Sequence, residues 1–168
     1  VNYMYSDYFE TPYESIKNLV QLQEMDDQIP NTHYLLGFNY DELLQYDKAI
    51  SQFEMALVIY DKWKSKPWWV RNYTYLGLEY IKTGQYRKAK KLYKKAERGF
   101  PDDPEIIYGK AILSYAVGDS IVANGFTKKY ISILKDNSLS EAEIASSLAD
   151  MYSEAGINER AEGFYRRA

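Results

Sequence analysis

The chain has 168 residues, of which 46% are hydrophobic and 27% are charged, and its formal net charge is −3. These are the proportions of a globular domain, and the small negative charge gives no general attraction to polyanions, so no nucleic-acid partner is expected. The absence of cysteine excludes disulfides, thiolate metal sites and cysteine nucleophiles. No apolar run reaches the roughly 20 residues needed to cross a bilayer, so we expect a soluble protein without membrane insertion.

The first predicted helix follows residues 1–10, which are either the remnant of an earlier helix or an aromatic arm. Residues 11–16 align with residues 84–89, which lie where a second helix of a hairpin begins. The alignment predicts a helix running to about Asp26. Residues 1–29 are therefore expected to form a degenerate half-repeat with its N-terminal arm.

A spaced set of apolar and small residues occurs three times in the rest of the chain. The set is Leu36, Gly37, Tyr40, Ala49, Phe53 and Ala56, then Leu76, Gly77, Tyr80, Ala89, Tyr93 and Ala96, and in weaker form Leu148, Ala149, Tyr152, Ala161, Tyr165 and Ala168. The small residues stand where two antiparallel helices of one hairpin would approach most closely. The pattern predicts an array of helical hairpins.

This pattern resembles the tetratricopeptide repeat, a helix–turn–helix unit of about 34 residues. The resemblance implies an all-α fold, a right-handed α-solenoid of antiparallel helical hairpins. Four repeats are expected at residues 30–69, 70–103, 104–141 and 142–168, of which the third is degenerate and the fourth is truncated. Because no polar capping helix closes the array, we expect a segment of a longer protein.

Local signals predict where several helices begin and end. The second helix of the first repeat is expected to run for an extra turn and to end before Pro67. Ser140 and Glu143 form a capping-box pattern, which predicts the start of a helix. Glycine is expected just past the first helix of three repeats, where left-handed backbone is needed: Gly84, Gly118 and Gly156.

No catalytic centre, cofactor site or metal site is predicted. His33 is the only histidine, and it occupies a slot where the family prefers a packing tryptophan, which favours a structural role. The nine glycines lack the spacing of a P-loop or a dinucleotide fingerprint. The acidic pairs Asp26-Asp27 and Asp102-Asp103 lie in predicted turns, where aspartate bonds its own backbone.

In arrays of this family, the first helices line a concave surface that binds other chains. Carried over by register, the resemblance predicts a groove that is aromatic in the middle and acidic toward its ends. Its residues are Tyr34, Phe38, Asp41, Glu42, Arg71, Tyr75, Leu78, Tyr108, Ile112 and Tyr115. Clustered aromatic surface is typical of a binding patch. The alternative is that these tyrosines pack between repeats.

The resemblance also indicates what the groove would bind. The lysine and asparagine residues with which some family members grip a C-terminal carboxylate are absent from the matching positions. A helix or an extended peptide that offers apolar or aromatic side chains, together with basic residues, is expected instead. We therefore expect a non-enzymatic protein-binding scaffold. The alternatives are a docking arm of a larger enzyme and a module that self-associates through uncapped array ends.

Two other surfaces stand out in the sequence. The basic run at residues 87–98 is predicted to turn its lysines to solvent on the convex side, the alternative being contact with an acidic partner or an anionic surface. Trp63, Trp68 and Trp69 cluster just before the second repeat. Packing in a local core is the favoured interpretation of these tryptophans, and contact with a domain outside this chain is the alternative.

Overall fold

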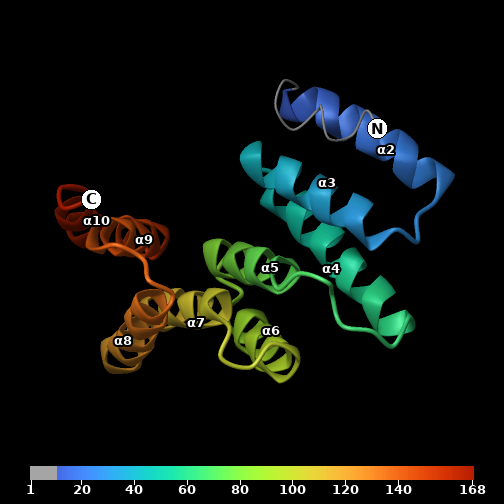
Figure 1. The fold of residues 1–168 in the computed structure, drawn as a ribbon. Helices are drawn as coiled ribbons and strands as arrows, with labels where there is room; N and C mark the ends of the chain where they lie inside the picture. The colour runs from blue at the N-terminus through green and yellow to red at the C-terminus, as the bar shows by residue number, and fades with distance from the viewer. Residues whose placement is uncertain (1–10) are drawn as a thin grey trace. The chain divides into compact units, whose positions relative to one another are not determined.

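The computed structural model describes residues 11–168, within which the chain forms nine α-helices and no strand (Figure 1). The expected arm or helix remnant at residues 1–10 lies outside the described residues. The chain divides into two compact units, Val1–Thr83 and Gly84–Ala168. This boundary falls inside the predicted second repeat, so the two helices of that repeat belong to different units.

The first unit contains four helices, joined by short connections. They are α2 (Pro12–Met25), α3 (Pro30–Glu42), α4 (Tyr46–Lys62) and α5 (Arg71–Lys82). Helix α3 packs against both α2 and α4, and α4 also packs against α5 (Figure 1). The helix predicted to run from residue 12 to about Asp26 is α2, which Thr11 and Glu14 open with a capping box.

The first hairpin contains the close helix contact that the repeating pattern predicts. A Cβ atom added to Gly37 of α3 would lie 2.7 Å from carbon atoms of the Phe53 ring on α4. Phe53, Ala49 and Ala56 have no exposed surface. Because no real Cβ tolerates so short a contact, glycine at this position lets the two helices of the hairpin approach each other.

The second unit contains five helices. They are α6 (Tyr86–Gly99), α7 (Pro104–Ala116), α8 (Ser120–Asp136), α9 (Glu141–Glu154) and α10 (Asn158–Tyr165). Helix α7 packs against α6, α8 and α9, and α9 also packs against α8 and α10. Gly109 of α7 makes room for the buried Tyr93 of α6, since a Cβ at that position would overlap the tyrosine ring.

The predicted helix ends are confirmed where local chemistry sets them. Ser140 and Glu143 form the capping box that opens α9, in which the Glu143 amide donates to Ser140 Oγ at 3.2 Å. Helix α4 ends at Lys62, before Pro67. The expected turn glycines all have left-handed backbone, with φ of 73° at Gly84, 80° at Gly118 and 73° at Gly156.

Candidate functional site

The predicted groove residues are divided between the two units. Those at positions 34 to 78 lie on α3 and α5 of the first unit, and Tyr108, Ile112 and Tyr115 lie on α7 of the second. A single continuous surface formed by these residues stays a prediction.

In the first unit, four aromatic rings from three helices form one cluster. Tyr75 of α5 meets Phe38 of α3 edge to face, with ring centroids 5.6 Å apart, and Tyr34 of α3 at 6.0 Å. The Tyr75 ring also stacks on Phe53 of α4 at 6.1 Å. Aromatic pairs at such separations contribute about 0.5–1.5 kcal/mol each beyond their burial. The cluster therefore fixes the position of the Tyr75 ring.

The members of this cluster differ in how much surface they offer. Tyr34 is 8% exposed, and its ring also contacts Phe53 and Trp69, so it packs between the first two repeats. Phe38 and Tyr75 are half-buried. The aromatic surface available in the first unit consists of these two partly exposed rings.

The acidic side of the predicted groove contains a charge cluster. Lys82 Nζ of α5 lies 2.7 Å from Asp41 Oδ1 of α3 and 2.7 Å from Glu79 Oε1. Glu79 is fully buried, and its second oxygen has no hydrogen-bond partner. Burial raises the pKa of Glu79 to about 7, against the opposing effect of Lys82. Glu79 is not among the residues that the sequence predicts for this surface, and its position next to the consensus residue Tyr80 is the one feature of the sequence that marks it.

The other predicted groove residues of the first unit lie at the ends of α3 and α5 and within α5. Glu42 is exposed at the C-terminal end of α3, and Arg71 is exposed at the first position of α5. Leu78 is half-buried on α5. The partly exposed rings therefore have an acidic group at one end and a basic group at the other.

In the second unit, the two predicted tyrosines are held by neighbouring tyrosines. The Tyr108 ring lies 5.5 Å from that of Tyr130, and burial, with the charge of Glu154, raises the pKa of Tyr108. The Tyr115 hydroxyl donates to Asn124 Oδ1 at 2.9 Å and lies 3.2 Å from the Tyr152 hydroxyl.

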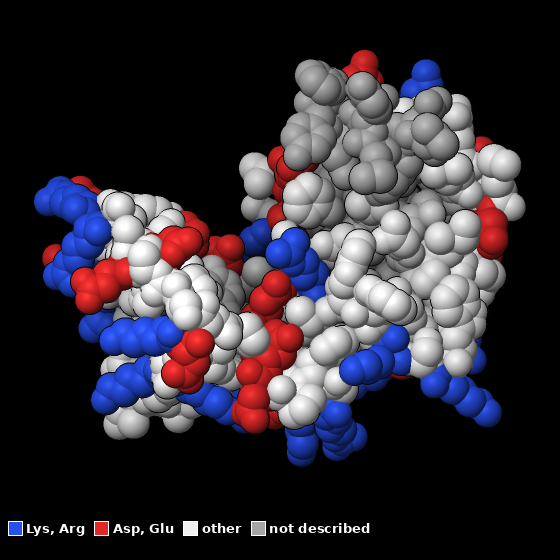
Figure 2. Space-filling view, in the orientation of Figure 1, with Lys and Arg blue, Asp and Glu red and all other residues white. Residues whose placement is uncertain are grey.

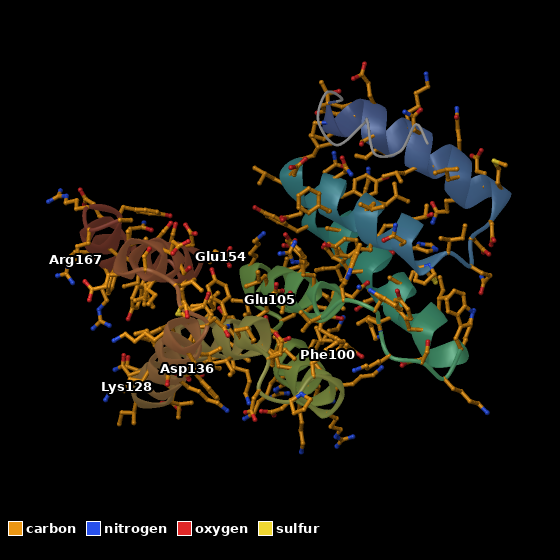
Figure 3. All side chains as sticks on the ribbon, viewed as in Figure 1. Phe100, Glu105, Lys128, Asp136, Glu154 and Arg167 are labelled. Atoms are coloured by element: carbon orange, nitrogen blue, oxygen red, sulfur yellow. The ribbon has the colours of Figure 1, made fainter. Side chains whose placement is uncertain are left out.

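Two acidic residues of this unit lie on α7 and α9. Figure 3 marks Glu105 on α7 and Glu154 on α9. Ile112 has no exposed surface and belongs to the core of the unit, so it is not an accessible anchor. Of the three predicted groove residues on α7, only Tyr108 and Tyr115 are partly exposed.

His33 has the structural role expected of it. Its ring is 3% exposed, with Nδ1 2.7 Å from Gln52 Oε1 and Nε2 2.8 Å from the Asp27 carbonyl oxygen. These bonds join α3 to α4 and to the turn that precedes α3. Within residues 11–168, no three His, Asp or Glu side chains gather in an arrangement that could hold a metal ion.

The prediction for the basic helix α6 is confirmed, and the prediction for the three tryptophans is wrong. Ala89, Tyr93 and Ala96 of α6 are buried and its lysines are exposed, as predicted, and Figure 2 shows basic side chains gathered around this helix. The predicted local core of tryptophans is not formed, since Trp63 and Trp69 are each 54% exposed and Trp68 is 84% exposed. No helix in the described part of the chain combines the length and hydropathy needed to cross a bilayer.

The helical hairpins, with small residues at the hairpin contact and left-handed turns after the first helices, define an all-α solenoid of the tetratricopeptide type. Similar solved structures are tetratricopeptide-repeat proteins. The residue 41-to-end structure of MamA from Desulfovibrio magneticus RS-1 matches with a TM-score of 0.68 and 15% identity, over 98% of this chain and 88% of that one. BtubC from P. vanneervenii matches with a TM-score of 0.65 and 20% identity, over 91% and 68% of the two chains.

Cut9, seen in an APC/C hetero-tetramer with Hcn1, matches with a TM-score of 0.71 and 15% identity. This chain is covered over 98% of its length by that match and spans 31% of the Cut9 chain. No family model and no curated protein sequence matches the chain. At these identities the similarity shows the fold alone, and it confirms the predicted resemblance at that level.

Proposed function

We propose that this chain is a non-enzymatic scaffold that binds a peptide or helix of a partner protein on the surface formed by its first helices. The observation that carries the proposal is the pair of partly exposed rings, Phe38 and Tyr75, beside the carboxylates of Asp41 and Glu42. Aromatic residues are enriched in binding interfaces, and a few of them supply most of the binding energy. The structural neighbours are protein-interaction modules, which supports a scaffold role.

The chemistry of this surface indicates what the ligand offers. Apolar or aromatic side chains would cover the Phe38 and Tyr75 rings, and a basic side chain would pair with Glu42. Asp41 already pairs with Lys82, so a basic ligand group would compete with that lysine for the carboxylate. Tyr108 and Tyr115 form a separate part of the predicted set, in the second unit.

The test begins with affinity capture by the intact chain from its native lysate and identification of the captured protein. Its binding segment is then titrated calorimetrically into the wild type and variants. Tyr75→Ala should weaken binding by on the order of 2 kcal/mol, because it removes a central aromatic anchor. Since Tyr75 also packs on Tyr34, Phe38 and Phe53, the melting temperature of this variant is measured alongside.

Two further variants separate loss of binding from loss of packing. Glu42→Arg reverses the charge of an exposed side chain at the end of α3. It should lower the affinity for a basic ligand while leaving the melting temperature unchanged. Lys91→Gln with Lys95→Gln, on the solvated face of α6, should leave affinity almost unchanged. If the lysine changes abolish capture while Tyr75→Ala and Glu42→Arg do nothing, the basic face is the binding surface and the proposal fails.

A further inference from the structure

The connection between α4 and α5 displays all three tryptophans of the chain. We call residues Trp63–Trp69 the tryptophan loop; it lies entirely within the first unit. Trp68 is 84% exposed, and Trp63 and Trp69 are each 54% exposed. A large apolar ring is costly to leave in water, and three exposed tryptophans within seven residues favour an interaction site.

The backbone of the loop is held in place by hydrogen bonds. The Lys64 amide donates to the Asp61 carbonyl oxygen at 3.0 Å, and the Ser65 amide donates to the Tyr60 carbonyl oxygen at 3.1 Å. Pro67 is fully buried and anchors the middle of the loop. The tryptophans are therefore presented outward by an ordered backbone, which reduces the entropy lost when they bind.

The rings of Trp63 and Trp69 each pack against a tyrosine, whereas Trp68 is the most exposed of the three tryptophans. Trp63 meets Tyr60 edge to face with centroids 6.0 Å apart, and Trp69 meets Tyr34 in the same way at 6.4 Å. Each of these two rings thus keeps one side on the protein and offers the other. Trp68 is the member whose removal should change binding without disturbing packing.

Three lysines lie close to the tryptophans in this segment of the sequence. Residues 61–69 contain Lys62, Lys64 and Lys66 against a single acidic residue, Asp61, although the whole chain carries a net charge of −3. Charges are screened beyond about 10 Å at ordinary ionic strength, so the local excess of lysine determines what the loop attracts. The loop is therefore both apolar and cationic.

We propose that the tryptophan loop binds the surface of an anionic phospholipid bilayer. Tryptophan is enriched at membrane–water interfaces, where its ring lies at headgroup level, and lysine is attracted to anionic headgroups. Lysine is depleted in protein–protein interfaces, so the combination of residues favours a lipid surface over a protein partner. The contact is peripheral, because it uses loop side chains and no spanning segment.

The full chain is tested with vesicles of phosphatidylcholine mixed with phosphatidylserine, and with vesicles of phosphatidylcholine alone. Because all three tryptophans of the chain lie in the loop, tryptophan fluorescence reports on this segment and on no other. We expect a blue shift of emission and co-sedimentation with the anionic vesicles, both weakened by added salt. The assay contains no peptide ligand, so its outcome is independent of the proposed groove.

Matched variants locate the contact. Lys62→Gln with Lys64→Gln should lower vesicle partitioning at least tenfold, since each lysine near an anionic surface is worth about fivefold. Trp68→Ala should lower vesicle partitioning several-fold, and the fluorescence of Trp63 and Trp69 still reports on binding in this variant. Lys90→Gln with Lys94→Gln removes the same charge from exposed positions of α6 and should have a much smaller effect.

Unchanged melting temperatures establish that each variant is folded. If emission does not shift with either vesicle, the proposal is wrong. If the changes at Lys90 and Lys94 abolish co-sedimentation while those at Lys62 and Lys64 do not, the lipid site lies on α6 and the proposal is equally wrong.

Discussion

Among single residues, Glu79 has an environment unlike that of an ordinary surface side chain. It is fully buried, one of its oxygens pairs with Lys82, and the other has no hydrogen-bond partner. Burying a carboxylate favours its neutral form, and the Lys82 ammonium, shared with Asp41, only partly offsets this. The pKa of Glu79 is therefore raised from an ordinary 4.5 to about 7.

This raised pKa predicts that the contribution of Glu79 to stability decreases with pH. Between about pH 4.5 and 7, the folded state holds a proton that the unfolded state has lost, so the free energy of unfolding falls as pH rises through that window. Glu79→Gln has no proton to lose. From pH 5 to pH 8, its stability should improve relative to the wild type by on the order of 2–3 kcal/mol, measured by urea unfolding. A constant difference between the two proteins would contradict the raised pKa.

At the scale of helices and turns, the first repeat differs from the others where its first helix ends. Gly84, Gly118 and Gly156 have left-handed backbone after their helices, and in the first repeat the equivalent position is Leu44, with φ of 57°. A side chain with Cβ is strained in this conformation by about 1–2 kcal/mol. Leu44 is 69% exposed, so its side chain gains little from burial in return.

Leu44→Gly should therefore raise the stability of the protein, because it removes this strain. Glycine costs roughly 0.5–1 kcal/mol in backbone entropy, so the expected net gain is up to about 1 kcal/mol, measured as a shift of the urea midpoint. Gly84→Ala is the matched control: a Cβ there meets nothing within 4 Å, so the expected loss of about 1 kcal/mol is a backbone effect. A loss of stability in Leu44→Gly would show that the leucine packs against something that outweighs the strain.

At the scale of the whole molecule, the boundary between the two compact units falls inside the predicted second repeat, so helix α5 belongs to the first unit and helix α6 to the second. The repeat pattern predicts that Gly77 of α5 and Ala89 of α6 face each other as the small residues of one hairpin. In a solenoid, stability is approximately a sum of repeat stabilities and nearest-neighbour contacts. The close approach of this pair stays a prediction of the repeat pattern.

The substitution Ala89→Leu tests the predicted pairing of Ala89 with Gly77. Ala89 has no exposed surface, and overpacking a close helix contact costs roughly 1–3 kcal/mol, so the melting temperature should fall. Ala142→Leu, the same substitution at an exposed position of α9, should change stability by no more than about 0.5 kcal/mol. An unchanged melting temperature in Ala89→Leu would show that the assumed register of the second hairpin is wrong.

The sequence by itself determined the class of fold and many helix boundaries. A capping box at Ser140, a proline at position 67 and turn glycines act through bonds and torsions a few residues apart, so their effect can be predicted without knowing what packs nearby. The spacing of small and apolar residues likewise identified Gly37 as the point of close contact in the first hairpin.

Only the tertiary structure decided which side chains remain accessible. Helical spacing tells which face of its own helix a residue occupies, but burial depends on what the neighbouring helices place against that face. Tyr34 and Ile112 were predicted to line the groove and are buried, whereas the tryptophans predicted to pack are exposed. The raised pKa of Glu79 has the same origin, because it requires α3 and α5 to enclose one carboxylate with a shared lysine. These outcomes depend on contacts between residues distant in sequence, which local pattern does not encode.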